Sequence, residues 1–482
     1  MSVHPGYLIA LPMIAALVLA ITNRWPRVRD AVSIVTAVLL FVGVCLLVAP
    51  VAAGARPDWI LFAILPGIGL RFTVEPLGVL FALVASGLWI PTAIYAVGYM
   101  EANQEGHRAR FAVCFALALA AAMGIAFAGN LVTLFLFYEA LTLITYPLVT
   151  HHGDDAARRG GRVYLGLLLG TSIGLFLPAI VITWAVAGTV AFAPGGILDG
   201  SLAPAAAAGL YALYLFGVGK AALMPFHRWL PAAMVAPTPV SALLHAVAVV
   251  KAGVFVVLKI TVYVFGLGYA GGFTEPMMWV AAVTVLGASI IALTRDNLKS
   301  RLAYSTISQL AYVVLGATLA TTLGIVGGAL HIVMHAAGKI TLFFCAGAIY
   351  TAAHKTCVSE LDGLGRAMPI TFAAFAVAAL SIVGLPPAGG TWSKWYLMLA
   401  AADAGHWVLI AVLAVSSLLS LGYLLDIPAR AFFRPAPDRG TRLAEAPWTC
   451  LLPLCAPALL SILLFFMAGP IVVFVQAALP GS

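Results

Sequence analysis

Charged residues are scarce in this chain. Of its 482 residues only 9% are Asp, Glu, Lys or Arg, whereas 63% are hydrophobic. A soluble domain carries about 25% charged residues, so this composition cannot cover the surface of a water-soluble fold of such length. The sequence therefore excludes a soluble globular protein and predicts a polytopic membrane protein of the all-α class.

Patterns that would hold metal clusters or nucleotides are missing as well. The six cysteines form no C-x-x-C pair, which removes support for iron–sulfur, zinc-ribbon and thioredoxin-like interpretations. Gly219-Lys220 and Gly338-Lys339 lack the other residues of a phosphate-binding loop, and no G-x-G-x-x-G follows a strand. We therefore expect no cofactor, no metal site and no catalytic chemistry within the chain, so an ion gradient or a partner must supply any energy it uses.

Apolar runs fill most of the chain. A transmembrane helix needs about 20 mostly apolar residues. About fourteen segments have this length, and an even number of spans places both termini on one side. The expected spans are 5–23, 31–51, 77–100, 111–129, 131–150, 163–188, 205–222, 238–264, 276–294, 302–320, 323–352, 369–400, 405–434 and 448–476.

The net charge of +8 follows this topology. If the first loop is cytoplasmic, most Lys and Arg residues fall on the cytoplasmic side, and the opposite side holds only Arg56, Arg71 and Lys259. Such an asymmetry is the positive-inside pattern of membrane proteins. We therefore expect a multi-pass protein of the cell (inner) membrane with both termini outside, and the basic charge does not indicate nucleic-acid binding.

Four lysines lie inside the expected spans, where charge is costly. A lysine at the bilayer centre costs about 2.5–3.5 kcal/mol on insertion scales, so such residues mark ion or proton pathways more often than structure. A purely structural scaffold would have no use for Lys220, Lys251, Lys339 and Lys394. Lys259, by contrast, is expected to extend to the outer interface.

Acidic groups that could balance these lysines are few. Glu139 is the one deep acid, and Asp426 lies near the end of the thirteenth span. We predict that Glu139 pairs with one of the lysines; the alternative is a protonated packing residue.

Histidines accompany the lysines. His331, His335 and Lys339 are spaced four apart and therefore share one face of a helix. A zinc site would need the glutamate of H-E-x-x-H, and Ile332 takes that place. A proton relay fits better than a metal site or satisfied core histidines, because histidine titrates near neutral pH. His245, six residues before Lys251, is a further relay candidate.

Two expected spans are broken by proline next to a lysine. Pro225 follows Lys220, and Pro386 and Pro387 precede Lys394. The two lysines lie five spans apart, which inverts one copy relative to the other, as in the repeats of secondary transporters. The predicted domains are N-terminal helices in 1–110, a first five-helix repeat in 111–264, a second in 276–434, and a last helix in 448–482.

Several motifs in fixed order resemble the antiporter-like proton-translocating subunits of respiratory complex I, membrane-bound hydrogenases and Mrp antiporters. They cover 219–231 (GKAALMPFHRWLP), 236–245 (APTPVSALLH), 250–253 (VKAG) and 296–310 (DNLKSRLAYSTISQL). The resemblance extends over roughly residues 70 to 430, nearly the whole chain. It implies the same fold, with broken helices 7 and 12.

The resemblance also implies roles for individual residues. Glu139 and Lys220 match the acid–lysine pair on the fifth and seventh helices of the family. The remaining matches form a partly hydrated proton axis through the middle of the membrane: Lys251, His331, His335, Lys339 and Lys394.

The run at 384–397 (GLPPAGGTWSKWYL) is most similar to the D-type subunit of Mrp Na+/H+ antiporters. The alternative is a proton-pumping component of a complex I-type oxidoreductase or a membrane-bound hydrogenase, and other assemblies of this fold, including inorganic-carbon uptake, remain open. Sodium prefers oxygen ligands, and the spans carry no carboxylate cluster. We therefore expect other membrane subunits as partners, one of which supplies the cation route.

Overall fold

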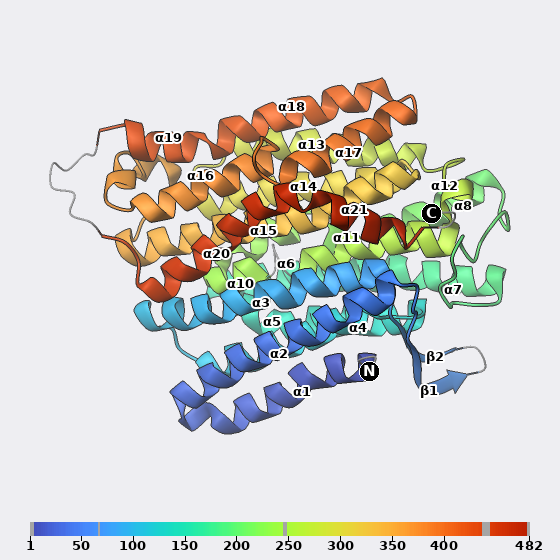
Figure 1. The fold of residues 1–482 in the computed structure, drawn as a ribbon, viewed down its shortest axis with the longest axis horizontal. Coiled ribbons are helices and arrows are strands. Elements are labelled where there is room, and N and C mark those ends of the chain that lie inside the picture. Colours follow the sequence, from blue (N-terminus) through green and yellow to red (C-terminus); the bar gives the residue numbers. More distant parts are fainter. Residues whose placement is uncertain (1–3, 66–67, 244–247, 436–443, 480–482) are drawn as a thin grey trace.

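The computed structural model describes residues 4–65, 68–243, 248–435 and 444–479. Its helices run side by side along the longest direction of the molecule, as Figure 1 shows. Both termini and a short β-hairpin lie toward one end of this bundle, whereas the turn after the first helix and α19 lie at the opposite end (Figure 1).

The N-terminal part consists of two outer helices and the hairpin. Its elements are α1 (Pro5–Ile21), η1 (Thr22–Arg24), α2 (Pro26–Ala52), β1 (Asp58–Leu65) and β2 (Ile68–Thr73). The strands pair in antiparallel fashion, from Asp58 opposite Thr73 inward. Asp58 accepts hydrogen bonds from Arg71 (2.8 Å) and Thr73 (2.6 Å). Burial would raise the pKa of Asp58, and these bonds together with the Arg71 charge bring it below its ordinary value.

The next helices surround Glu139 and Lys220. They are α3 (Pro76–Ala102), α4 (Arg108–Ala126), α5 (Leu131–Val149), α6 (Asp155–Thr171), η2 (Ser172–Phe176), α7 (Leu177–Ala187) and α8 (Pro204–Gly217). Proline begins α1, α2, α3 and α8, where its missing N–H would have no partner in the helix anyway. Asn130 and Asp154 cap α5 and α6 by accepting from the amides of Thr133 (2.7 Å) and Ala157 (2.6 Å).

The chain after α8 is broken into short pieces. They are η3 (Gly219–Ala221), α9 (Trp229–Ala232), η4 (Ala233–Val235) and α10 (Thr238–Ala242), followed by α11 (Val249–Ile260), η6 (Thr261–Phe265) and α12 (Leu267–Ala270). Non-helical backbone at membrane depth is tolerated only where protein or a hydrated cavity surrounds it. This segment is accordingly buried between α5, α6, α11 and α14.

The second half repeats long helices and one further break. Its elements are α13 (Glu275–Leu293), α14 (Leu298–Thr318), α15 (Thr322–Ala353), η7 (Val358–Glu360), η8 (Leu364–Arg366), α16 (Pro369–Val383), α17 (Gly390–Asp403), α18 (Trp407–Leu424), α19 (Asp426–Phe433), α20 (Trp448–Phe466) and α21 (Ala468–Gln476). Helix α16 ends at Gly384, whose positive φ of 89° terminates the helix ahead of Pro386 and Pro387.

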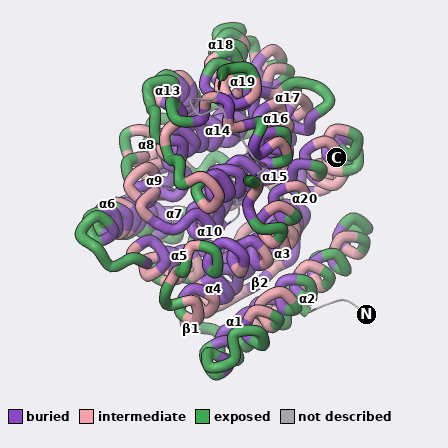
Figure 2. Tube along the Cα trace, turned by 90° about the vertical axis from the view of Figure 1, so that its left-hand side faces the viewer, coloured by how far each residue is buried: buried purple, intermediate pink, exposed green. Residues whose placement is uncertain are grey.

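Helix α15 lies at the centre of the molecule and is buried along nearly its whole length, as Figure 2 shows, whereas α1 and α2 lie at the edge. It packs against α3, α14, α16, α17 and α20. Gly316 on α14 and Gly324 on α15 permit a close approach of these two helices, because a Cβ on either one would collide with the carbonyl of the other. The central helix therefore places its polar residues away from lipid.

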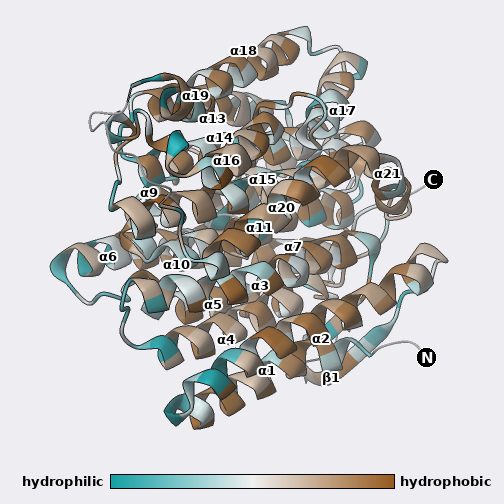
Figure 3. Cartoon of the chain, turned by 60° about the vertical axis from the view of Figure 1, so that its left-hand side comes forward, coloured by the Kyte–Doolittle hydropathy of each residue, from teal (hydrophilic) through white to brown (hydrophobic). Residues whose placement is uncertain are grey.

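Ten helices of the described residues are long and apolar enough to cross a membrane, and Pro204–Gly217 and Pro369–Val383 are shorter apolar helices. Figure 3 shows hydrophobic residues along the helices and hydrophilic ones at the α1–α2 turn and the start of α6. The all-α, multi-pass membrane class is thereby confirmed. Fourteen crossings and inverted repeats stay predictions, because four of the expected spans (205–222, 238–264, 302–320 and 369–400) are divided, short or rich in hydroxyl groups.

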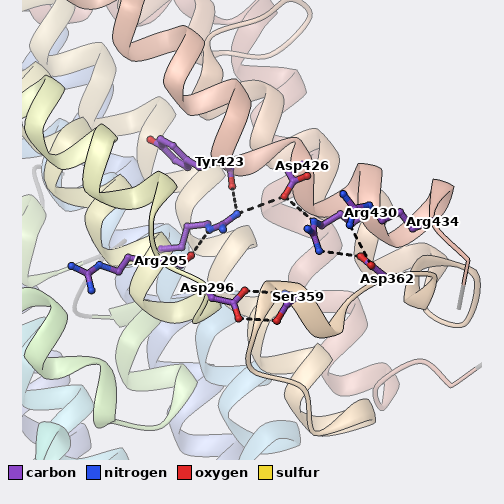
Figure 4. Close-up of polar contacts among 9 residues, drawn as sticks. Arg295, Asp296, Ser359, Asp362, Tyr423, Asp426, Arg430 and Arg434 are labelled. Carbon is purple, nitrogen blue, oxygen red and sulfur yellow. Dashed lines mark hydrogen bonds and ion pairs between the residues drawn. The ribbon is translucent and has the colours of Figure 1, made fainter. Parts of the chain in front are cut away.

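A network of charged residues ties the loops together at the end that carries α19 (Figure 4). Arg430 contacts Asp426 (3.1 Å) and Asp362 (3.2 Å). Asp296 accepts two hydrogen bonds from Ser359 (2.9 and 2.7 Å), and these hold the pKa of Asp296 below its ordinary value. Asp426 thus belongs to a surface network and not to the interior of the bundle.

Candidate functional site

Lys220 lies in the break after α8. Its ammonium group donates to the carbonyl of Tyr138 (2.7 Å) and to Thr142 Oγ1 (2.5 Å), both on α5. The same ammonium lies 3.2 Å from the centroid of the Tyr138 ring, which adds a cation–π contact. The side chain is fully buried. A lysine placed here has exchanged water for neutral oxygens and an aromatic face.

The backbone around Lys220 is held by the neighbouring elements. Its amide donates to the hydroxyl of Tyr138 (3.0 Å), and Trp229 Nε1 donates to the carbonyl of Gly219 (2.9 Å). Gly253 on α11 lies so close that a Cβ there would collide with the Lys220 backbone. The unwound turn is thus supported on both sides, in agreement with a break ahead of Pro225.

Glu139 follows Tyr138 on α5 and is half-buried. Both of its carboxylate oxygens are shielded and lack a hydrogen bond of good geometry, although Ser172 and Lys220 are close enough to interact with it. Among the ion pairs of the described residues there is none between Glu139 and Lys220. The direct ion pair that the sequence predicts is therefore absent, and Lys220 is bound to Tyr138 and Thr142 in its place.

A line of nitrogen atoms crosses the centre of the molecule. Lys251 Nζ on α11 forms a hydrogen bond with His335 Nδ1 on α15. The His335 ring stacks on the His331 ring at 5.7 Å, and His331 Nδ1 contacts Ser393 Oγ at 2.9 Å on α17. The Tyr312 ring stacks on the His331 ring at 5.2 Å and lies 4.9 Å from Lys394 Nζ, so the four predicted groups Lys251, His335, His331 and Lys394 follow one another through the interior.

Lys339 shares the helical face of the histidines but points to a different neighbour. Its ammonium donates to Ser305 Oγ (2.8 Å) and to the carbonyl of Leu302 (3.2 Å), both on α14. Lys251 and Lys339 are both fully buried. The face predicted from i, i+4 spacing therefore divides, with the imidazoles facing α11 and α17 and the lysine facing α14.

Lys394 lies on α17, in the second turn after the break. Its ammonium donates to the carbonyl of Val383 (2.9 Å), which the end of α16 leaves free, and to Ser417 Oγ (2.9 Å) on α18. It also lies 4.9 Å from the ring centroid of Tyr312. A cavity of about 390 Å³ between α17 and α18 reaches this lysine. Lys220 and Lys394 are thus held in the same way: each lies next to a helix break, and its ammonium donates to one backbone carbonyl and one side-chain hydroxyl.

Lys259 differs from the expectation that it extends to the outer interface. It is fully buried and forms an ion pair of 2.6 Å with Glu75, at the start of α3. It also donates to the carbonyl of Ala128 (2.6 Å). The prediction was wrong because Glu75 immediately precedes the expected third span and was not counted among the buried acids. Glu75 and Lys259 line a cavity of about 290 Å³ at the hairpin end, together with Arg56 and Arg71.

The four lysines of the proposed axis have no such partner. Within the described parts of the chain, none of Lys220, Lys251, Lys339 and Lys394 forms an ion pair with a carboxylate. In this they differ from Lys259, whose ammonium is paired with the carboxylate of Glu75.

Two predictions from the sequence remain, the relay role of His245 and the absence of a metal site. His245 lies outside the described residues. No group of three or more His, Cys, Asp or Glu side chains that could hold a metal ion occurs in the described ranges.

Sequence reasoning missed the hydroxyl groups that hold the lysines: Thr142, Ser305, Ser393 and Ser417. Their helical positions alone do not distinguish them from serines and threonines that bond to their own helix. Only the neighbouring helices reveal which lysine each one reaches.

The chain is similar to known proteins in sequence and in structure. A family model described as NADH:quinone oxidoreductase/Mrp antiporter, TM matches residues 128–420. NADH-quinone oxidoreductase subunit N of Desulforudis audaxviator (strain MP104C) is 33% identical over 401 residues, which make up 82% of this chain and 77% of that one. A probable K(+)/H(+) antiporter subunit of Rhizobium meliloti (strain 1021) is 31% identical over 414 residues, or 81% of this chain and 39% of that protein.

A chain in the structure of the Mrp complex from Dietzia sp. DQ12-45-1b superposes with a TM-score of 0.88. It is 22% identical, and the match covers 98% of this chain and 96% of that one. At this identity the likeness shows the fold. The family model and the subunit N relative show that the chain belongs to the NADH:quinone oxidoreductase/Mrp antiporter transmembrane family, as its motifs predict.

Proposed function

We propose that this chain is the proton-translocating membrane component of a multisubunit cation/proton antiporter, with Na+ as the exchanged cation. The observation that carries the proposal is the buried path Lys251–His335–His331–Ser393–Lys394. Four buried lysines without carboxylate partners would be expensive in a scaffold, since insertion of each costs about 2.5–3.5 kcal/mol. A role in proton transfer explains why the chain contains these lysines in spite of the cost.

Glu139 and Lys220 act as the control point of this path. The ammonium of Lys220 lies between neutral oxygens of α5, and the Glu139 carboxylate on the same helix is close but not in contact. Movement of Lys220 toward Glu139 strengthens the hold on its proton, and movement away weakens it. The proton then passes to Lys251, His335 and onward to Lys394.

Partner subunits complete the assembly. The axis is basic or neutral, which does not suit sodium, a cation that prefers oxygen ligands. A partner therefore supplies the cation route, and the two routes couple electrostatically. The chain lies in the cell (inner) membrane with its basic loops in the cytoplasm and both termini outside; this orientation follows the positive-inside pattern, and Figure 1 places both termini toward one end.

A second candidate function is proton pumping within a complex I-type oxidoreductase or membrane-bound hydrogenase. The observation in its favour is the 33% identity with an NADH-quinone oxidoreductase subunit N. Both functions use the same proton path. They differ in what drives it, a cation gradient in one case and a redox partner in the other.

Liposomes test the proposal. The chain is co-purified with its neighbouring membrane subunits, and proton movement is recorded after a sodium gradient is imposed. The proposal predicts exchange by the assembly, no exchange by the isolated chain, and loss of exchange in an assembly that carries Lys394→Ala. Wild-type exchange by the Lys394→Ala assembly contradicts the path. Exchange by the isolated chain contradicts the division of the two routes.

A further inference from the structure

Hydroxyl side chains gather between α13, α14 and α18. Ser289, Ser308 and Ser416 come from these three helices, and all are fully buried. Their oxygens form a triangle, with Ser289 at 2.8 Å from Ser308 and 3.0 Å from Ser416, and with Ser308 at 3.4 Å from Ser416. Three serine hydroxyls in mutual contact inside an apolar bundle call for an explanation.

The triangle continues toward Lys339. The hydroxyl of Tyr423 lies 2.9 Å from Ser420 Oγ, and it also interacts with Ser289 and Ser305. Ser305 accepts the hydrogen bond from Lys339 Nζ at 2.8 Å. In Figure 4 the Tyr423 ring points away from the surface ion pairs, and only its backbone carbonyl faces them. The phenol is thus available to the buried hydroxyls.

The triangle also continues toward Lys394. The hydroxyl of Tyr312 donates to the carbonyl of Leu413 (3.2 Å) and also interacts with Ser416 and Ser417, and Ser417 Oγ accepts from Lys394 Nζ at 2.9 Å. Hydroxyl groups therefore follow one another between Lys339 and Lys394: three of the links are direct hydrogen bonds, and the phenols of Tyr423 and Tyr312 lie in the two gaps between them. The order is Lys339, Ser305, Tyr423, Ser289, Ser416, Tyr312, Ser417 and Lys394.

We propose that these hydroxyls form a second proton route to Lys394, which starts at Lys339 and runs beside the imidazole route from Lys251 through His335 and His331. The inference rests on the proposed proton-translocating function and adds residues to its path. Each hydroxyl offers one proton and two lone pairs. In one concerted shift the Lys339 ammonium gives its proton to Ser305, each hydroxyl passes its own proton onward, and Ser417 protonates the neutral Lys394 amine. Every hydroxyl keeps one proton, so the step is balanced.

Two of the serine O–H groups each have a second acceptor toward which they can turn. Ser289 and Ser308 each lie 2.9 Å from the carbonyl of Val285, as well as next to another hydroxyl. The proton on each serine can therefore turn from a hydroxyl to a carbonyl without losing a hydrogen bond. This turn returns a hydrogen-bonded chain to its starting orientation after a proton has passed.

A role in helix packing alone makes a different prediction. Hydrogen bonds between membrane helices contribute little to stability on average, so under this alternative their loss changes stability slightly and leaves proton transfer intact. Ser461 on α20 provides a matched control, because it is fully buried and its hydroxyl bonds to the Pro457 carbonyl of its own helix (3.0 Å).

The test compares Ser289→Ala, Tyr423→Phe and Ser461→Ala in the reconstituted assembly. The route predicts that Ser289→Ala and Tyr423→Phe lower sodium-driven proton movement by about three- to tenfold, as for loss of one ordinary hydrogen bond from the path. They also change the ratio of rates in H2O and D2O, and Ser461→Ala changes neither. His335→Gln alone leaves part of the transport, whereas His335→Gln with Tyr423→Phe removes it.

Wild-type rates and isotope ratios in Ser289→Ala and Tyr423→Phe overturn the hydroxyl route. A fall in rate that only follows a fall in the amount of folded protein, with the isotope ratio unchanged, overturns it too. A double variant no slower than His335→Gln alone contradicts the two parallel routes. Wild-type transport by Lys394→Ala in the same liposomes would instead contradict the proposed function itself.

Discussion

Two buried lysines in the first half of the molecule are held in different ways. Lys259, near the hairpin end, forms a direct ion pair with Glu75 at 2.6 Å. Lys220, in the break after α8, has Glu139 nearby but donates to Tyr138 and a threonine hydroxyl. Both regions contain one glutamate and one lysine, but only Glu75 and Lys259 form a direct ion pair.

The difference separates a fixed pair from one that can change. Breaking a buried ion pair by removing one partner costs about 3–5 kcal/mol, because the other charge stays behind unpaired. The Glu75–Lys259 pair therefore acts as a clamp, by which we mean that it holds the start of α3 firmly against α11. The open arrangement of Glu139 and Lys220 costs less to rearrange, which is what a control point for proton movement requires.

We call the surroundings of Lys220 and Glu139 the open site, and the Glu75–Lys259 ion pair the closed site. The largest expected effect is on transport at the open site. Lys220→Ala should reduce proton movement in inverted vesicles to the level of vesicles that lack the protein, because the path loses a proton-carrying group. Lys355→Ala is the matched control, since Lys355 lies on the surface in a pair with Glu360 (3.5 Å). Equal rates in the two variants would remove the distinction between the open site and an ordinary lysine.

At the closed site the expected effect is on stability. Lys259→Ala should lower the free energy of unfolding by about 3–5 kcal/mol, because Glu75 stays buried without its partner. The double variant Lys259→Met with Glu75→Gln should recover part of this loss, since it leaves no unpaired charge. Thermal unfolding of the purified assembly in detergent measures both. An unchanged midpoint for Lys259→Ala would show that the pair is not a clamp.

A smaller effect is expected when the open site loses one hydroxyl. Thr142→Val keeps the shape of the side chain but removes the oxygen that accepts from Lys220 at 2.5 Å. Transport should fall by about ten- to a hundredfold, as for loss of one hydrogen bond to a charged group. Thr145→Val is the control on the same helix, because Thr145 contacts Tyr164 (2.6 Å) and no lysine. The idea fails if both threonine variants transport alike.

The smallest effect is expected at the hairpin beside the closed site. Asp58→Asn weakens the contacts with Arg71 and Thr73 on a partly exposed surface, which stabilise by less than about 1 kcal/mol. Because these contacts lower the pKa of Asp58, their contribution is present at neutral pH and is lost as the pH falls through that pKa. Unfolding midpoints of wild type and variant should therefore converge in acid. A difference that grows in acid would contradict this sign.

Much of the fold could be predicted from composition and the length of apolar runs. The runs at 5–23 and 131–150 correspond closely to α1 and α5, since hydrophobic length is a strong signal for membrane helices. The broken segment after α8 was less predictable, because its short helices have no period of their own. The run at 238–264 becomes α10, α11 and η6 around residues outside the described part.

The candidate site was predictable residue by residue, but its contacts were not. A lysine inside an apolar run is conspicuous, so Lys251 and Lys394 could be found from the sequence alone. The partner of each lysine depends on how the helices pack. Glu75 was missed for this reason, as were the serines between α13, α14 and α18, which in sequence resemble ordinary helix residues.

The central claim is that Glu139 controls proton movement along the buried axis. The most direct test is the dissipation of a pH gradient by Glu139→Gln in inverted vesicles that contain the whole assembly. The substitution keeps the size of the side chain and removes only its charge. The account predicts loss of cation-driven proton movement with a normal amount of inserted protein. A wild-type rate in Glu139→Gln would contradict it.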